Sequence, residues 1–383
     1  MSSSLVFNYL TTMNQRSATD LYLTVGHPPA LRIDNRLENL GSEPLQPNDL
    51  DDILSNVLTL RQKREFETNM ELNSALDMGV HGRFRINVLK QRQHPALVIR
   101  RIISRIPVFD ELNLPSVFGP LSMIKRGLIL VTGMTGSGKS TTLASMIDYR
   151  NTHSQGHIIT IEDPIEYHHD HKQSIVTQRE IGVDTENYSI ALKNALRQRP
   201  DVILVGEIRD REVMEQALTA SETGHLCLAT IHTNNSYQAI QRIVNLFPEE
   251  HQRQIAFSLA TNLKAIVSQR LVPAISGGQT IALEILLNEG HVRELIQEGK
   301  FNKIKEIIES NQATGMCSFD QSLLELYKQG RITEETALAQ SDMPGDLKIR
   351  IKQAKLGDQE GALAKLNTDN LSIFDPEPVI RSR

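Results

Sequence analysis

A glycine-rich segment that ends in Gly-Lys-Ser is the part of the sequence with the most specific chemistry. It runs from Gly133 to Thr141 and follows an apolar stretch at residues 127–132. Glycines let backbone N–H groups approach phosphate oxygens, the lysine can reach the β- and γ-phosphates, and the serine hydroxyl can ligate Mg²⁺. The segment therefore predicts a nucleotide-phosphate site built from Gly133, Thr135, Gly136, Ser137, Gly138, Lys139, Ser140 and Thr141.

Acidic residues directly follow a second apolar stretch, at residues 157–161. They are Glu162 and Asp163, with Glu166 three residues further on. Carboxylates at this position can orient water on Mg²⁺ or polarise an attacking water. A solvated acidic loop is the alternative. Because the glycine-rich segment fixes the ligand-binding edge of the sheet, we expect Glu162 and Asp163 to join Ser140 at the metal.

Two acidic residues lie at opposite ends of the apolar stretch at residues 202–205. Asp201 precedes this stretch and Glu207 follows it. At about 3.3 Å per residue they are roughly 20 Å apart, so they cannot serve the same phosphate. Glu207, at the carboxyl end, is the candidate base that activates water, and Asp201 is expected to be structural.

Two histidines lie on either side of a further apolar stretch, at residues 226–231. His232 follows it, where an imidazole can sense the γ-phosphate or stabilise developing charge. His225 precedes it, so direct phosphate contact is not expected and a role at an interface fits better. For each histidine a purely structural role is the alternative.

Arginines cluster on two strand-like segments near residues 83–101. Arg83 and Arg85 are two positions apart and so share one face of a strand, and Arg100 and Arg101 lie on the next segment. One interpretation is a basic sheet surface paired with nearby acids. The other is a set of arginines offered to a neighbouring subunit's triphosphate, where a guanidinium stabilises transition-state charge. Spacing alone leaves both open.

The elements that must position these groups fall into two domains. In residues 1–103 we expect a small α+β domain, and in residues 104–118 a linker marked by proline and glycine. Residues 119–345 alternate between apolar strands and helices, which predicts a mostly parallel, doubly wound α/β sheet. Residues 346–383 are polar, and we expect a helix there at most, followed by a disordered end. In the first domain, the expected helices span residues 5–15 and 49–68, and the expected strands 20–24, 30–33, 82–89 and 96–103.

Composition narrows the class of protein. A chain of 383 residues is long enough for two domains with appendages, and a net charge of −5 argues against a protein that coats nucleic acid. Only two cysteines are present, which indicates reduced thiols rather than a disulfide framework. No segment has the pattern of a membrane span or signal peptide, so we expect a cytoplasmic protein without direct membrane insertion.

Taken together, these segments resemble the hexameric secretion and type IV pilus ATPases, and among them the PilT/PilU retraction motors of twitching motility. The resemblance covers residues 5 to about 345. It is carried by the glycine-rich loop and by Asp20-Leu-Tyr-Leu23, Gly26-His-Pro-Pro29, Gly82-Arg-Phe-Arg-Ile-Asn87, Ile161-Glu-Asp-Pro-Ile-Glu166, Gly206-Glu207 and Thr223-Gly-His with Ile-His-Thr233.

The resemblance implies a PAS-like N-terminal domain joined to a RecA-like P-loop ATPase domain, assembled as a homo-hexamer around ATP and Mg²⁺. It implies that Glu207 is the catalytic carboxylate, that Glu166 belongs to the family's catalytic Asp box and that His225 and His232 form a histidine box. It also implies nucleotide-facing roles for Arg83, Arg85 and Arg100. A cytoplasmic location at the inner-membrane pilus base, a platform protein there and a paralogous PilT-type partner follow from the same likeness.

Two departures from the family pattern qualify these expectations. The chain continues about 38 residues past the usual end of PilT-type proteins, which points to the PilU branch of accessory motors. The segment His291-Val-Arg293-Glu294-Leu-Ile296 keeps the arginine of the family's pattern there, but residues beside it differ. A RecA-like nucleic-acid translocase and an ATP-gated scaffold for a paralogous motor are the alternative functions.

Overall fold

The computed structural model describes residues 5–33, 36–79, 82–102, 105–310 and 315–355. The chain divides into two units, residues 1–128 with 140–230, and residues 129–139 with 231–383. The described strands form two sheets. The first sheet ends with β6 (His94–Ile102) and the second begins with β7 (Gly127–Thr132). The domain boundaries predicted near residues 103 and 118 lie between the two sheets and stay a prediction.

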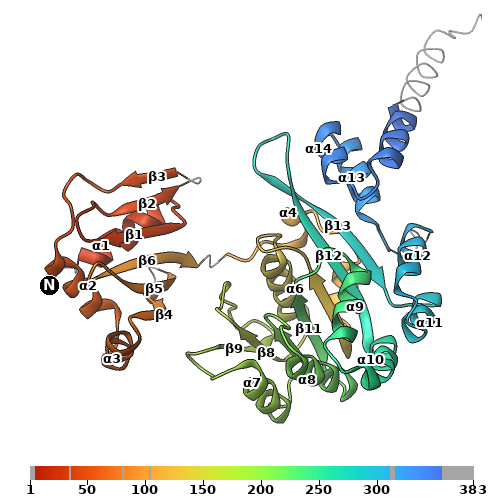
Figure 1. Cartoon of the computed structure of the whole chain (residues 1–383), viewed down its shortest axis with the longest axis horizontal. Coiled ribbons are helices and arrows are strands. Elements are labelled where there is room, and N and C mark those ends of the chain that lie inside the picture. Colours follow the sequence, from red (N-terminus) through yellow and green to blue (C-terminus); the bar gives the residue numbers. More distant parts are fainter. Residues whose placement is uncertain (1–4, 34–35, 80–81, 103–104, 311–314, 356–383) are drawn as a thin grey trace, which may run out of the picture. The chain divides into compact units, whose positions relative to one another are not determined.

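The first sheet is antiparallel, with strand order β3-β2-β1-β6-β5-β4. Helix α1 (Leu5–Gln15) buries Val6, Leu10 and Met13, whose spacing places them on one helix face. They belong to a core with Leu21 and Phe84 of the sheet. This small α+β layer (Figure 1) is the predicted PAS-like fold. Its other elements are β1 (Asp20–Thr24), β2 (Ala30–Ile33), β3 (Arg36–Asn39), β4 (Glu71–Asp77), β5 (Arg83–Gln91), α2 (Pro47–Val57) and α3 (Leu60–Asn69).

One helix prediction in this region was wrong in its extent. The single helix expected over residues 49–68 is two helices, because Leu58 is extended and Thr59 starts α3 as its N-cap. The Thr59 side chain accepts a hydrogen bond from Gln62 N, which satisfies a backbone donor that a continuous helix would use internally. Strand β3 was not predicted, because all four of its residues are exposed and lack apolar alternation.

The second sheet has strand order β13-β12-β7-β11-β10-β8-β9. Every residue of β7, β10 and β11 is buried, as expected for parallel strands covered on both faces. The β8–β9, β8–β10 and β10–β11 pairs are parallel, and β12–β13 is antiparallel. The predicted mostly parallel α/β sheet is therefore confirmed. The strands are β8 (Gly156–Glu162), β9 (Ser174–Glu180), β10 (Val202–Val205), β11 (Leu226–Ile231), β12 (Leu263–Pro273) and β13 (Gln279–Leu287).

The helices that follow these strands begin at capping side chains. Asn187, Asp210 and Asn235 each accept a hydrogen bond from the backbone N–H three residues on, at the start of α7, α8 and α9. The numbered helices in this part of the chain are α4 (Phe109–Leu112), α5 (Phe118–Ser122), α6 (Lys139–His153), α7 (Tyr188–Ala195), α8 (Arg211–Glu222), α9 (Ser236–Asn245), α10 (Glu249–Asn262), α11 (His291–Gln297), α12 (Ile304–Ser310), α13 (Phe319–Lys328) and α14 (Glu334–Gln340).

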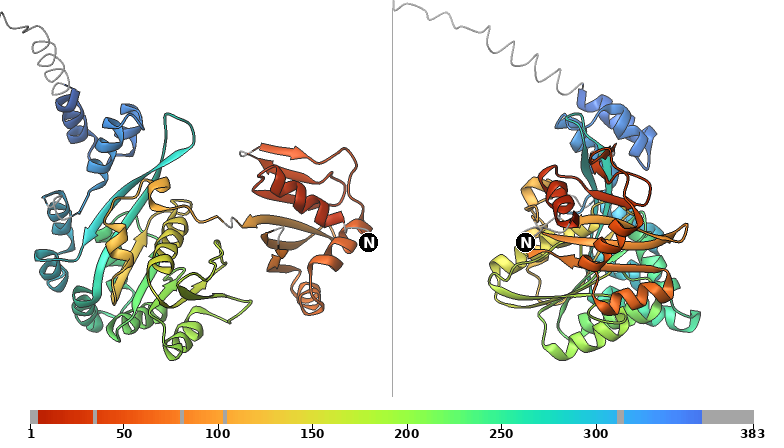
Figure 2. Two further views of the ribbon diagram at one scale, coloured as in Figure 1. Left: turned by 180° about the vertical axis from the view of Figure 1, so that it is seen from behind. Right: turned by 90° about the vertical axis from the view of Figure 1, so that its left-hand side faces the viewer.

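The C-terminal region contains the helix that the sequence allowed there, but this helix packs into a core instead of being solvated on all sides. Residues 344–355 are helical, and Leu347 and Ile351 are fully buried in a small core with Phe319 and Leu323 of α13. Their spacing of four residues puts both on one helix face, but the exposed Ile349 between them makes the local sequence alternate between apolar and charged residues. In Figure 2 the blue helices of this core lie beside the β12–β13 hairpin. The disordered end predicted for the final residues lies outside the described residues.

Candidate active site

The loop after β7 is shaped by glycines. Gly133, Gly136 and Gly138 have φ values of 147°, 78° and 88°, a region that side chains disfavour. A Cβ at Gly133 would lie 2.4 Å from Ser137 Oγ and 2.6 Å from the Gln269 carbonyl oxygen. The loop can therefore close on itself only with glycine at this position.

Lys139, the first residue of α6, is buried against this loop. Its Nζ donates to the carbonyl oxygens of Gly133 at 2.9 Å and Met134 at 3.0 Å, and lies 3.5 Å from His232 Nδ1. The buried Ser137 Oγ has no hydrogen-bond partner among the residues that the structure describes. An ammonium group and an unsatisfied hydroxyl inside a glycine loop suit the phosphates of a nucleotide.

Three further predicted loop residues surround this core. Thr135 is exposed, and Ser140 is half-buried at the second position of α6. Thr141 Oγ1 lies 2.9 Å from Tyr167 Oη, which belongs to the acidic loop after β8. No group of three or more ligating side chains suited to a metal occurs within the described ranges.

The acidic loop begins with Glu162 at the carboxyl end of β8. Its Oε1 accepts hydrogen bonds from Thr160 Oγ1 at 2.7 Å and Gln178 Nε2 at 3.4 Å. Burial raises the pKa of Glu162 to about 7, against the lowering effect of these bonds. Glu166 is exposed further along the loop. Glu162, the first acid, is thus hydrogen-bonded to neighbouring side chains, whereas Glu166, the last acid, is exposed to solvent.

Glu207 lies just beyond the carboxyl end of β10. It follows Gly206, which is closely surrounded by other residues. A Cβ at Gly206 would meet Tyr188 Oη at 2.9 Å and Glu162 Cα at 3.2 Å. Glu207 Oε2 accepts a hydrogen bond from Arg209 Nε at 2.7 Å, and Arg209 Nη1 lies 3.4 Å from Asp163 Oδ2. The bond to Glu207 is the main cause that raises the pKa of Arg209. One guanidinium therefore links two predicted site carboxylates.

Thr230, near the end of β11, fixes the backbone on both sides of Glu207. Its Oγ1 donates to the Gly206 carbonyl oxygen at 2.5 Å, and its own carbonyl oxygen accepts from Ile208 N at 2.9 Å. Sequence reasoning did not single out Thr230 or Arg209. Each lies within two residues of a predicted site residue, and only a strand pairing or a folded loop reveals the contact.

The two histidines lie at opposite ends of β11. His232 follows the strand and comes within 3.5 Å of Lys139, whereas His225 precedes it. His225 Nδ1 lies 3.1 Å from both the Ala220 carbonyl oxygen and Thr223 Oγ1. The structure thus brings His232, and not His225, to the phosphate loop. A cavity of about 640 Å³ opens beside His232, lined also by Met134 and Arg242.

The loop after His232 is anchored by a buried acid. Glu284 Oε1, on β13, accepts hydrogen bonds from Ser236 N at 2.7 Å, Ser236 Oγ at 2.6 Å and Ser268 Oγ at 3.3 Å. Ser236 is the first residue of α9, so the carboxylate lies at a helix N-terminus, where negative charge is favoured. Burial raises the pKa of Glu284.

The arginines of the first sheet divide into paired and like-charged positions. Arg100 Nε donates to Asp20 Oδ1 at 2.8 Å, and the Asp20 side chain is buried. Across the β5–β6 ladder Arg85 lies directly opposite Arg100. Like charges facing each other in this way destabilise a sheet unless an anion offsets them. Arg83 shares the face of Arg85.

Comparison with known proteins places this site in a family. The chain matches the model of the family "Type II/IV secretion system protein" over residues 83–335. It is 44% identical over 373 residues to the type IV pilus ATPase PilU of Pseudomonas aeruginosa, covering 97% of this chain and 98% of that protein. It is 39% identical to PilT of the same organism, described as the type IV pilus retraction ATPase, covering 86% and 96% respectively.

Solved structures agree with these relatives. The crystal structure of the pilus retraction motor PilT with bound ADP superposes with a TM-score of 0.85 and 43% identity, covering 90% of this chain and 98% of that one. The ATPase DotB of Legionella pneumophila gives a TM-score of 0.73 at 25% identity, covering 88% and 95%. The chain is therefore a RecA-like ATPase and belongs to the Type II/IV secretion system protein family. Within that family it is a type IV pilus ATPase.

Proposed function

We propose that this chain is an ATP-hydrolysing motor of the type IV pilus machinery that drives or assists pilus retraction in twitching motility. Its likeness to PilU along nearly the whole of both chains supports this function. The observation that carries the chemistry is the arrangement at the phosphate loop. There, Lys139 and an unsatisfied Ser137 hydroxyl lie within a glycine loop, with His232 at 3.5 Å from the lysine.

In the proposed reaction the glycine loop holds the phosphates of ATP and Lys139 neutralises charge on the β- and γ-phosphates. The Ser140 hydroxyl, Glu162 and Asp163 would hold Mg²⁺. Bound there, Mg²⁺ would offset the charge of the phosphate oxygens. Gly136 and Gly138 let the backbone amides face the phosphates, and Thr135 and Thr141 complete the loop.

Glu207 is the proposed base. Its carboxylate accepts a proton from water while the water oxygen attacks the γ-phosphorus and the bond to the leaving ADP oxygen breaks. Glu166 would help to orient that water, and His232 would stabilise the charge that develops. In its present position Glu207 bonds Arg209. Productive attack requires the carboxylate to turn from this guanidinium toward the water.

We further propose a cytoplasmic homo-hexamer, peripheral at the inner membrane, in which Arg83, Arg85 and Arg100 of one subunit face the nucleotide of the next. Arg85 lies directly opposite Arg100, and Asp20 pairs with Arg100, so a charge on Arg85 that faces this cation supports an anion-binding role for the face. His225, at the far end of β11, suits an interface role. A PilT-type motor and an inner-membrane platform protein are the proposed partners.

Glu207→Gln tests the assignment. The variant should bind ATP with wild-type affinity and lose about 10²- to 10⁴-fold in turnover, because general-base catalysis is removed. The matched control is Glu249→Gln, an exposed position at the start of α10. Wild-type turnover by Glu207→Gln would remove Glu207 from the mechanism.

Two added measurements separate the alternatives. Stimulation of wild-type turnover by single-stranded DNA, lost at high salt, would favour a translocase over a pilus motor. Absence of turnover by the purified wild type, with nucleotide binding intact, would favour a scaffold. Oligomer mass is recorded in the same experiments.

A further inference from the structure

The acidic loop between β8 and β9 is hydrogen-bonded along its first half by the amide side chain of Gln178, on β9. In the β8–β9 register Gln178 lies beside Thr160, and Glu180 lies beside Glu162. Residues paired in this way share one face of the sheet. Gln178 therefore lies on the same sheet face as Thr160, close to where the loop leaves β8 at Glu162. This loop returns to the sheet at Ser174, the first residue of β9.

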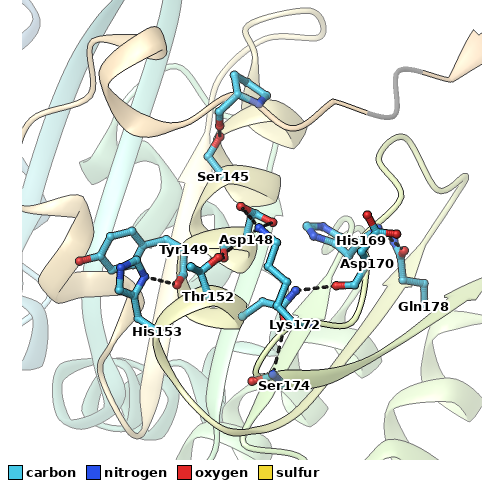
Figure 3. Close-up of polar contacts among 12 residues, drawn as sticks. Ser145, Asp148, Tyr149, Thr152, His153, His169, Asp170, Lys172, Ser174 and Gln178 are labelled. Atoms are coloured by element: carbon cyan, nitrogen blue, oxygen red, sulfur yellow. Dashed lines mark hydrogen bonds and ion pairs between the residues drawn. The ribbon is translucent and has the colours of Figure 1, made fainter.

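The Gln178 amide uses both of its ends on this loop. Nε2 donates to the Tyr167 carbonyl oxygen at 2.8 Å and to Glu162 Oε1 at 3.4 Å. Oε1 accepts a hydrogen bond from His169 N at 2.8 Å. Both residues are labelled in Figure 3. A single side chain thus contacts the start, middle and later part of the loop.

Glu166 lies between fixed points of this network. Ile165 N donates to Glu180 Oε2 at 3.1 Å on one side, and Gln178 holds Tyr167 on the other. The backbone of Glu166 and the Gln178 side chain both lower the pKa of the Glu162 carboxyl, and Gln178 Nε2 contacts its Oε1 at 3.4 Å. The position of Glu166 therefore depends on an amide that does not touch it.

The returning half of the loop is fastened separately to α6. Asn151 Nδ2 donates to the Asp170 carbonyl oxygen at 2.7 Å. Lys172 Nζ donates to Asp148 Oδ1 at 2.7 Å, a contact between two residues that Figure 3 labels. These bonds do not involve Gln178. Loss of the amide would therefore release the segment around Glu166 while the loop stays attached to α6.

We infer that Gln178 is a positioning residue for ATP hydrolysis that acts through Glu166, by fixing the Glu162 carboxylate and the backbone at Tyr167 and His169. The inference rests on the proposed role of Glu166 in the reaction. It gives Gln178 no contact with ATP. The amide is needed as donor and acceptor at once, a combination that neither an apolar side chain nor a carboxylate provides.

The test is Gln178→Met, which keeps the length of the side chain and removes its polar atoms. We expect kcat to fall by about 10- to 100-fold, the scale of a small misplacement of a reacting group. KM for ATP should stay near the wild-type value, because the phosphate loop is untouched. Gln178→Glu keeps the acceptor for His169 N and removes the donor, and we expect a similar loss. If Gln178→Met fails to fold, Gln178→Glu is used to test the inference in its place.

The matched control is Gln173→Met, the same change at an exposed position just before β9. It should turn over ATP like the wild type. Thermal unfolding and oligomer mass of each variant check that the fold is kept. Wild-type kcat in folded Gln178→Met would overturn the inference.

A double-mutant cycle with Glu166→Gln separates a positioning role from a structural one. If Gln178 acts through Glu166, adding Gln178→Met to Glu166→Gln should cost no further kcat. An additive loss would contradict the inference. Wild-type turnover by Glu166→Gln alone would contradict the proposed function instead, so the two failures are distinguishable.

Discussion

The two ends of the parallel strands in the second sheet carry similar residues and use them differently. At the amino ends, Asp201 Oδ2 accepts a hydrogen bond from His157 N at 2.8 Å, and His225 contacts the Ala220 carbonyl. At the carboxyl ends, Glu207 and His232 contact charged side chains instead. The strand end, rather than the residue type, decides whether an acid or imidazole serves the backbone or lies where a ligand binds.

Among the changes that test this comparison, the largest expected effect is that of Lys139→Ala, in the glycine loop that follows the carboxyl end of β7. Turnover should fall by about 10²- to 10³-fold, because a buried cation that stabilises phosphate charge is lost. Lys125→Ala, an exposed position at the amino end of the same strand, is the matched control. Turnover of both variants is measured by phosphate release, and their affinity by nucleotide binding. Equal turnover of the two variants would contradict the inference that the carboxyl ends of the strands, and not the amino ends, carry the reaction.

A smaller effect is expected for Gly206→Ala, which changes the backbone before Glu207. The added Cβ would press on Tyr188 Oη and on the backbone of Glu162. We expect a roughly 10- to 100-fold loss of kcat with a destabilisation of about 1–3 kcal/mol. Gly345→Ala, with no atom within 4 Å of its added Cβ, is the control. Full activity of Gly206→Ala would show that Glu207 tolerates displacement.

The amino end should respond in stability and not in catalysis. Asp201→Ala removes the acceptor for His157 N and should lower the free energy of unfolding by about 1 kcal/mol. Turnover per folded subunit should match the wild type. Denaturant midpoints and kcat measured on the same preparations check both quantities. A drop in kcat without loss of stability would assign Asp201 to the reaction.

The smallest expected effect is a pH dependence from Glu284, whose pKa burial raises above the usual 4.5. As pH rises above about 4.5 the unfolded chain loses this proton first, so the stability of the wild type falls. Glu284→Gln lacks this proton equilibrium. Its Tm relative to the wild type should therefore increase between about pH 4.5 and pH 7. A Tm difference that stays constant with pH would contradict a raised pKa.

Sequence patterns predicted the features that depend on local backbone. The phosphate loop is recognisable because glycines at 133, 136 and 138 are required by positive φ values. The parallel sheet is recognisable because buried strands read as continuous apolar runs. The separation of Asp201 from Glu207 followed from strand geometry alone, and the structure places them at opposite ends of β10.

Features that depend on distant pairings could not be predicted from local patterns. Gln178 is 16 positions from Glu162 and Thr230 is 24 positions from Gly206. Each contact exists only after the strands pair in a particular register. The end of one helix and the start of the next at Thr59 were missed for a local reason. The composition of residues 49–68 is helix-like throughout, but the Thr59 side chain caps a new helix.

The burial of Leu347 and Ile351 has a practical consequence for truncation experiments. A chain cut at residue 345 would lose two apolar side chains from the small core around Phe319 and expose what they cover. Any loss of function would then report a damaged scaffold rather than the missing tail. Truncation after residue 355 leaves that packing whole, so it is the cut that isolates the contribution of the final segment.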